Sequence, residues 1–191
     1  NRVICLDNLN TEYKFIKKNL KRYKKNFFYL KCNLENYEEI KNTITEIKKF
    51  NIIDILINNA AITGDTLKTG WNTKFKNQSY ENFERALKVN LLSVFEISKR
   101  LKYQMNKSKS PSVVNISSIY AKLAHDKKLY NKTNINNPAA YSASKAALDQ
   151  LTRWLASELS PKIRVNSILP GGIKRNQSKL FINKYIRIYK Q

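Results

Sequence analysis

Tyr141 and Lys145 lie in the segment PAAYSASKAAL and are separated by Ser, Ala and Ser. On a helix this spacing places the two side chains one turn apart on the same face. A tyrosine hydroxyl ordinarily titrates at about 10. A neighbouring ammonium, helped by the positive end of the helix dipole, would lower that pKa by favouring the phenolate. Such a pair can exchange a proton with an alcohol or carbonyl group near neutral pH.

Spacing alone does not identify a catalytic pair in this sequence. Three further Tyr-x-x-x-Lys pairs occur, at Tyr13/Lys17, Tyr37/Lys41 and Tyr103/Lys107. What distinguishes one pair from another must therefore be its position relative to the strands and helices that surround it.

The net charge of +22 raises the alternative of a basic nucleic-acid-binding module, because phosphate contacts favour basic proteins. The basic residues are 28 Lys and 8 Arg, spread along the chain, whereas bidentate phosphate recognition favours Arg. Asn and Ile are also abundant, and like Lys they have AT-rich codons. The composition therefore indicates codon bias more than a nucleic-acid ligand.

The remaining composition favours a folded cytoplasmic protein. No apolar run reaches the roughly 20 residues needed to cross a bilayer. The first residues, NRVICLDNLN, lack the long apolar centre of a signal peptide. Cys5 and Cys32 are the two cysteines, so we expect neither a disulfide framework nor a metal site.

Apolar runs of strand length alternate with helical patterns, without a visible domain boundary between residues 1 and 191. The predicted strands are 2–7, 27–32, 52–57, 112–117 and 163–169. The predicted helices are 11–24, one from Asn36 with Glu39 at the capping-box position, one from Ser79 to about 104, and 139–159. This alternation predicts one Rossmann-type α/β domain, a doubly wound parallel sheet with helices on both faces.

Such sheets bind ligands beyond the carboxyl ends of their strands. Asp7 ends the first predicted strand, where it could hold ribose hydroxyls or act as a turn residue. NNAA (58–61) follows the third strand, Ser117 and Ser118 the fourth, and PGG (170–172) the fifth. Small residues at these places allow a ligand to approach the backbone, and the turn at PGG could lie against a flat ring.

Two helices bring further polar groups toward this edge. Asn90 falls on the same face of the long helix as Phe83, Leu87, Val94 and Leu101, and a buried amide needs hydrogen-bond partners. It can be a core residue bonded to a loop or part of a site. Tyr141 and Lys145 begin the last predicted helix, whose N-terminal end points to the same edge as Ser118.

The order of these motifs resembles the short-chain dehydrogenase/reductase family of NAD(P)-dependent oxidoreductases. The resemblance rests on Asp7, NNAA (58–61), KVN (88–90), ISS (116–118), YSASK (141–145) and PGG (170–172). It covers essentially the whole chain. It implies hydride transfer directly between a nicotinamide and a substrate carbon, which requires no metal.

The resemblance also implies roles for individual residues. Tyr141 would be the general acid/base, and Ser118 would bind and polarise the substrate oxygen. Lys145 would lower the tyrosine pKa and bind the nicotinamide ribose, and Asn90 would hold a water linking Lys145 to solvent. The implied cofactor contacts are Asp7, Asn33, Leu34, Asn59, Ala60, Ala61, Tyr141, Lys145, Pro170, Gly171, Gly172 and Ile173, and the implied substrate contacts are Ser118, Tyr141 and Gly171. Asp7 favours NAD over NADP, because an acidic residue there disfavours a 2′-phosphate.

The sequence departs from the family pattern in several places. Ala61 stands where Gly is usual, Asn33 where Asp is common, and Arg175 near a usual Thr. A Gly-rich phosphate turn belongs roughly 20 residues before the acidic residue, which Asp7 leaves no room for. We therefore expect a fragment that lacks the first βα unit and the C-terminal end, and that binds NAD poorly by itself.

The substrate prediction depends on the polar segment 121–138, which separates Ser118 from Tyr141 and carries His125 and four lysines. The segment is either a solvated loop or a lid for a large polar substrate. SSIYAKLA, LYNKTN, PAAYSASKAAL and PGGIKRNQ, in this order, are similar to the flagellin-modification branch of the family, which favours a sugar or nucleotide-linked sugar. A 3-oxoacyl carrier-protein reductase is the alternative substrate class, and a basic nucleic-acid-binding module on a retired dehydrogenase fold is the alternative outside enzymes. The family is often dimeric or tetrameric, so a homo-oligomer is expected, without a membrane partner.

Overall fold

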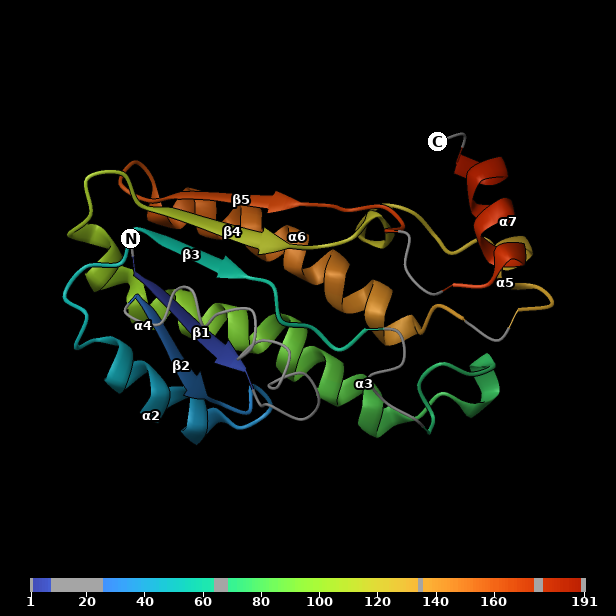
Figure 1. The fold of residues 1–191 in the computed structure, drawn as a ribbon, viewed down its shortest axis with the longest axis horizontal. Helices are drawn as coiled ribbons and strands as arrows, with labels where there is room; N and C mark the ends of the chain where they lie inside the picture. Colours follow the sequence, from blue (N-terminus) through green and yellow to red (C-terminus); the bar gives the residue numbers. More distant parts are fainter. Residues whose placement is uncertain (1, 8–25, 64–68, 134–135, 174–176, 190–191) are drawn as a thin grey trace.

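The computed structural model describes residues 2–7, 26–63, 69–133, 136–173 and 177–189, in which strands alternate with helices (Figure 1). The strands are β1 (Val3–Asp7), β2 (Phe27–Lys31), β3 (Ile55–Asn58), β4 (Ser112–Ile116) and β5 (Arg164–Ile168). The α-helices are α2 (Tyr37–Ile47), α3 (Tyr80–Leu87), α4 (Ser93–Asn106), α5 (Lys127–Tyr130), α6 (Ala139–Leu159) and α7 (Lys179–Tyr189). Single turns η2 (Phe75–Asn77), η3 (Lys88–Leu92) and η4 (Ile119–Ala121) complete the described elements.

All described strand pairs are parallel, which confirms the Rossmann-type α/β prediction. The strands form two hydrogen-bonded groups, β1–β2 and β3–β4–β5. Val3 pairs with Phe27 in the first group, and Leu56, Val113 and Val165 pair in register across the second. Among the described strands no ladder joins β1 to β3. Because β3, β4 and β5 are parallel neighbours, their polar carboxyl ends lie together at one edge.

The main core lies between the sheet and the helices α2, α4 and α6. It contains Cys32, Ile40, Ile44, Ile47, Ile97, Leu101, Met105, Val113, Leu155, Leu159, Ile163 and Val165. On the other side of β3, Ile55 and Ile57 are exposed by 62% and 60%. Helices α2, α4 and α6 thus contribute to one core, and the helix predicted at 11–24 lies outside the described residues.

The long helix predicted from Ser79 is continuous but contains a π turn. The Ser79 side chain caps α3 by accepting the Asn82 N–H, and α3 runs through the π turn η3 into α4. Asn90 lies in η3 and is buried, as its place on the apolar face predicts. Phe83 is exposed, because the π turn adds a residue and rotates α3 relative to the register expected for one uninterrupted α-helix.

The helix predicted at 139–159 is α6, and its inward stripe includes the buried Leu148, Leu155 and Leu159. The segment before it is not one loop, since it contains η4 and α5. The sequence pattern did not predict α7, which begins after Ser178 and lies beside α5 beyond the ends of β4 and β5 (Figure 1).

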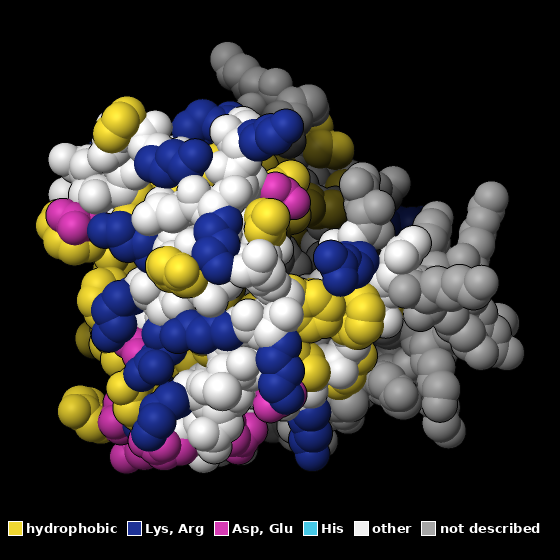
Figure 2. Space-filling model, turned by 90° about the vertical axis from the view of Figure 1, so that its left-hand side faces the viewer, with side chains coloured by type: hydrophobic (Ala, Val, Ile, Leu, Met, Phe, Trp, Pro, Cys, Tyr) yellow, Lys and Arg dark blue, Asp and Glu magenta, His cyan; other side chains and the backbone are white. Residues whose placement is uncertain are grey.

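Lys and Arg side chains are dispersed among other residues on the face drawn in Figure 2, and they do not form one tract there. This distribution agrees with the even spread of basic residues along the sequence. Within the described ranges, the helices are too short or too polar to cross a bilayer.

Candidate active site

The first turn of α6 is held by residues from other segments. Pro138 precedes the helix and offers no side-chain cap, and the Ala139 N–H instead donates to the Gln78 side-chain oxygen at 3.0 Å. The Asn137 amide donates to the Ser142 hydroxyl at 2.8 Å. These bonds fix the helix end that carries Tyr141 beside the carboxyl edge of the sheet.

Ser118 and Tyr141 meet at this edge. The Ser118 side chain lies near enough to the Tyr141 hydroxyl to act on its pKa. Burial raises the pKa of Tyr141, and the interaction with Ser118 opposes that rise. The sequence argument expected an ammonium to lower the pKa of this tyrosine, whereas burial raises it in the structure. The two hydroxyls are placed to bind one oxygen atom of a substrate.

Lys145 lies one turn further along α6 and is only 2% exposed. Its ammonium donates to the Ile116 backbone oxygen at 2.6 Å and lies 5.9 Å from the centre of the Tyr141 ring. Burial lowers the pKa of Lys145 to about 8. The side chain is therefore beneath the tyrosine, between α6 and the end of β4.

Asn90 is bonded on both sides of its amide. Its oxygen accepts the Ile62 N–H at 2.8 Å, and its nitrogen donates to the Ser144 hydroxyl at 2.9 Å. Ser144 in turn donates to the Tyr141 backbone oxygen at 2.9 Å. Asn90 thus joins the segment after β3 to the helix turn between Tyr141 and Lys145, without a direct bond to Lys145.

Side-chain amides tie the ends of β3 and β4 to each other and to α6. Asn58 donates to Asn115 at 2.8 Å, and Asn115 donates to the Thr152 hydroxyl of α6 at 2.9 Å. Beyond Asn58, the small residues Asn59 and Ala60 are exposed and Ala61 is half-buried. The backbone here is open to a ligand, as the predicted cofactor contacts at 59–61 require.

Asp7 ends β1, where its backbone oxygen accepts the Tyr29 hydroxyl at 2.7 Å and the Cys32 N–H at 2.9 Å. Its place at a carboxyl strand end is the one predicted for a ribose contact. Asp7 belongs to the β1–β2 pair, so no strand ladder in the described structure connects it with the catalytic set on β4 and α6.

Asn33 and Leu34 follow β2 and are engaged within the protein. The Asn33 side-chain oxygen accepts the Glu35 N–H at 3.0 Å, and the Asn33 N–H donates to Glu39 at 2.8 Å. The capping-box pattern predicted that the Glu39 carboxylate would accept the Asn36 N–H. In the structure it accepts the Asn33 N–H instead. Leu34 packs against the main core, so neither of these two predicted cofactor contacts presents an unengaged side chain.

The turn after β5 is occupied by an aromatic ring of the same chain. Pro170 accepts the Ile119 N–H at 3.1 Å, which joins this turn to the end of β4. The Gly172 N–H donates to the Tyr185 hydroxyl at 2.5 Å, and a Cβ at Gly172 would lie 2.7 Å from the Tyr185 ring. The flat ring that lies against this turn in the structure is therefore the side chain of Tyr185 from α7. Gly171 and Ile173 flank the contact, with Ile173 exposed.

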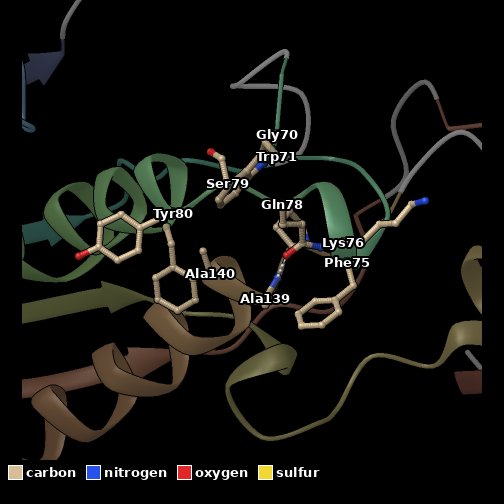
Figure 3. Close-up of a pocket in the computed structure, with 11 residues that line it drawn as sticks. Gly70, Trp71, Phe75, Lys76, Gln78, Ser79, Tyr80, Ala139 and Ala140 are labelled. Carbon is tan, nitrogen blue, oxygen red and sulfur yellow. Dashed lines mark hydrogen bonds between the residues drawn. The ribbon is translucent and has the colours of Figure 1, made fainter.

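A cavity of about 430 Å³ opens beside the first turn of α6 (Figure 3). Its lining comes from three segments and includes Trp71, Phe75 and Tyr80 on one side and Ala139 and Ala140 on the other. None of Ser118, Tyr141 and Lys145 lines it. The cavity is adjacent to the catalytic helix turn but separate from the reacting hydroxyls.

The sequence did not predict the contribution of α7 to this edge. Leu180, Phe181, Lys184, Tyr185 and Ile188 have the spacing of a helix, and the Ser178 hydroxyl accepts the Phe181 N–H at 3.2 Å. An N-cap serine before this pattern was the signal that could have found the helix.

The described residues fit a nicotinamide cofactor at this edge. An ammonium has three donors, and the buried Lys145 uses one of them on Ile116, so ribose hydroxyls can accept the others. Exposed small residues after β3 provide room on the same side of the sheet, whereas the turn at Gly172 is filled by the Tyr185 ring.

Comparison with known proteins places the chain among short-chain dehydrogenases. The family described as short chain dehydrogenase matches residues 1–184. The 3-oxoacyl-acyl-carrier-protein reductase FabG of Buchnera aphidicola subsp. Schizaphis graminum is 37% identical over 166 residues, covering 85% of this chain and 61% of that protein. The post-translational flagellin modification protein A of Campylobacter coli is 28% identical over 165 residues, covering 85% and 63%.

Solved structures show the same relationship. The aldohexose dehydrogenase of Thermoplasma acidophilum has a TM-score of 0.70 and 26% identity, over 98% of this chain and 68% of that one. A 4-hydroxyisoleucine dehydrogenase complexed with NADH and succinate has a TM-score of 0.69 and 28% identity, over 100% and 78%.

The chain spans 61% and 63% of the length of the two curated relatives. The family match extends over residues 1–184, and it agrees with the parallel strands and with the side chains gathered at their carboxyl ends. The chain belongs to the short-chain dehydrogenase/reductase family of oxidoreductases.

Proposed function

We propose that the protein interconverts an alcohol and a carbonyl group by hydride transfer, with Tyr141 as the general acid/base. The observation that carries this proposal is the juxtaposition of Ser118 and Tyr141 at the carboxyl edge, with the ammonium of Lys145 buried behind them. A nicotinamide cofactor, when bound, supplies or accepts the hydride. The chain's own residues bind the oxygen and move the proton.

The two hydroxyls would hold a carbonyl oxygen between them. Ser118 donates a hydrogen bond that polarises the carbonyl, and Tyr141 donates the proton that the developing alkoxide needs. Lys145, when protonated, stabilises the phenolate that remains. Asn90 fixes the helix turn that carries both residues through Ser144, so it acts here as a positioning residue.

We propose NAD as the cofactor, with NADP second. Asp7 ends β1 at the position where an acidic side chain binds ribose hydroxyls and repels a 2′-phosphate. The 28% identical dehydrogenase was solved with NADH.

For the substrate, we propose a polyhydroxylated compound of the sugar class. The polar segment 121–138 borders the site at both ends, and one similar structure is an aldohexose dehydrogenase. A 3-oxoacyl thioester is the second candidate, because the FabG relative has higher sequence identity and a charge of +22 suits an acidic carrier protein.

The full-length protein tests both candidates directly. We expect NAD-dependent turnover of alditols or aldoses, and weaker turnover with NADP. Faster NADPH-dependent reduction of a 3-oxoacyl thioester would select the second candidate. Failure of the full-length protein to transfer hydride with any alcohol or carbonyl compound would refute the proposed function.

We also propose a homo-oligomer. Leu92 and Trp154 are exposed by 54% and 53% on the neighbouring helical elements η3 and α6, and Phe95 of α4 is exposed as well. Exposed apolar groups of this size are typical of protein interfaces. Sedimentation of the full-length protein as a dimer or tetramer is the expected result, and a monomer would contradict it.

A further inference from the structure

The segment between Ser118 and Tyr141 is attached to the protein at both ends. Near its start, Lys122 forms an ion pair with Asp149 of α6 at 2.8 Å. Near its end, the Asn136 N–H donates to Asn72 at 2.5 Å. Between them, Leu129 of α5 is fully buried. These contacts give α5 a fixed position beside the catalytic edge.

Three tyrosine hydroxyls meet at this place. The Tyr120 and Tyr130 hydroxyls are hydrogen-bonded to each other, and Tyr189 of α7 acts electrostatically on both. We call these three residues the tyrosine cluster. They come from η4, α5 and α7, so the cluster exists only when the three elements are packed together.

The tyrosine cluster adjoins the catalytic hydroxyls. The Tyr120 N–H donates to the Ser118 hydroxyl at 3.2 Å. Tyr141 acts electrostatically on Tyr130 and contributes to the rise of its pKa. The Tyr130 hydroxyl therefore lies within electrostatic reach of the proposed general acid/base.

Helix α7 closes the outer side of the cluster. Lys184 donates to the Lys128 backbone oxygen at 3.2 Å and to that of Asn131. The Phe181 ring lies between those of Tyr130 and Tyr185, at 6.0 and 6.1 Å from their centres. Because Tyr185 also bonds Gly172, one row of rings reaches from α5 to the turn after β5.

The chemistry of the cluster suits a hydroxyl-bearing ligand. Burial, as the largest cause, raises the pKa of Tyr130 to about 12 and raises that of Tyr120 as well. Both side chains therefore stay neutral near physiological pH, and each can donate and accept a hydrogen bond. A site built to bond a substrate hydroxyl discriminates against analogues that lack it, since its buried polar groups would be left unpaired.

We propose that Tyr130, oriented by Tyr120, is a specificity-determining residue that hydrogen-bonds a hydroxyl group of a polyhydroxylated substrate next to the reacting carbon. This inference rests on the proposed function of Tyr141, and it assigns the selection of the substrate class to the segment 121–138.

The test compares two probe series in the full-length protein with NAD: alditols, and monohydroxy secondary alcohols of the same chain length. Tyr130→Phe removes the hydroxyl and keeps the ring. We expect kcat/KM for alditols to fall about 2- to 10-fold through KM, the effect of one neutral hydrogen bond. For monohydroxy alcohols it should stay within about twofold. Tyr103→Phe is the matched control, because Tyr103 is 66% exposed on α4.

Equal losses on both series, or no loss on either, would overturn the assignment of Tyr130. So would a wild-type protein that oxidises monohydroxy alcohols but no alditol. If Tyr130→Phe does not fold, Tyr120→Phe reports the same ratio, since it removes the partner that orients Tyr130, and an unchanged ratio again counts against the proposal. A wild-type protein inactive on both series, and on the matching ketones and aldoses, refutes the proposed function instead.

Discussion

Two Tyr-x-x-x-Lys pairs in this chain have the same spacing and different surroundings. Tyr103 and Lys107 lie at the C-terminal end of α4, where the ammonium is 4.5 Å from the centre of an exposed ring. Tyr141 and Lys145 lie at the N-terminal end of α6, with Lys145 buried and Tyr141 next to Ser118.

The comparison shows that the same spacing can serve proton transfer only where the helix end and its burial favour it. At the N-terminal end of α6 the helix dipole favours a phenolate, and at the C-terminal end of α4 it opposes one. The chain direction also places the two ends at opposite edges of the sheet, because α4 leads into the start of β4. The α4 pair therefore serves as an internal control for the α6 pair.

The largest expected difference is in catalysis. Tyr141→Phe should lower kcat of the full-length protein by about 100- to 10,000-fold, the usual contribution of a general acid/base, and leave NADH binding nearly unchanged. Tyr103→Phe should change kcat by less than about twofold. Steady-state kinetics and NADH fluorescence titration measure both, and an active Tyr141→Phe would show that the role assignment is wrong.

The next difference is in the pH dependence of stability. The pKa of Lys145 is lowered to about 8 in the folded protein from 10.5, so between these values the unfolded chain binds the extra proton. The free energy of unfolding should therefore rise with pH through this window, by roughly 3 kcal/mol from Lys145.

Urea unfolding at several pH values, compared with Lys145→Met, isolates this contribution as a difference that grows across the window. Lys107→Met is the matched control and should show no such growth. A constant difference for Lys145→Met would mean that burial does not perturb this ammonium.

A smaller effect is expected at Asn90. Asn90→Ala leaves the buried Ile62 N–H without its acceptor and Ser144 without its donor. It should lower the free energy of unfolding by about 1–3 kcal/mol. Asn51→Ala, which removes the exposed partner of Lys107, should cost less than about 0.5 kcal/mol. Equal losses of unfolding free energy for the two variants, measured by urea unfolding, would show that the buried bonds of Asn90 do not stabilise the fold.

The smallest effect concerns the α4 pair itself. A double-mutant cycle of Tyr103→Leu and Lys107→Met should give a coupling energy of about 0.5–1 kcal/mol, as for exposed cation–π contacts. A coupling of several kcal/mol would mean that the α4 pair interacts as strongly as a buried pair, despite its exposure.

Much of the fold could be predicted because its signals are local. The five described strands coincide with apolar runs, and Ser79 and Asn36 are side-chain caps where the sequence predicted them. The π turn at Asn90 could not be predicted from the 3.6-residue helical period, because a π turn is itself an interruption of that period. Helix α7 was missed although its N-cap serine and apolar spacing were readable.

The candidate site divides in the same way. Tyr141, Ser118 and Asn90 were identifiable by residue type and by position after a strand or on an apolar helix face. The cofactor-side residues were less accessible to such reasoning. Asn33 is hydrogen-bonded to Glu35 and Glu39, and the Gly172 N–H donates to the Tyr185 hydroxyl. These contacts depend on how neighbouring segments pack, so residue type alone could not reveal them.

The sequence by itself determined the alternation of strands and helices and the order of the motifs, because both depend on residues near one another in the chain. Tertiary structure decided which Tyr-x-x-x-Lys pair is buried beside a serine, because only the sheet brings β4 and α6 together. It also decided that Tyr120, Tyr130 and Tyr189 meet, since hydroxyls from three separate elements converge only when those elements pack.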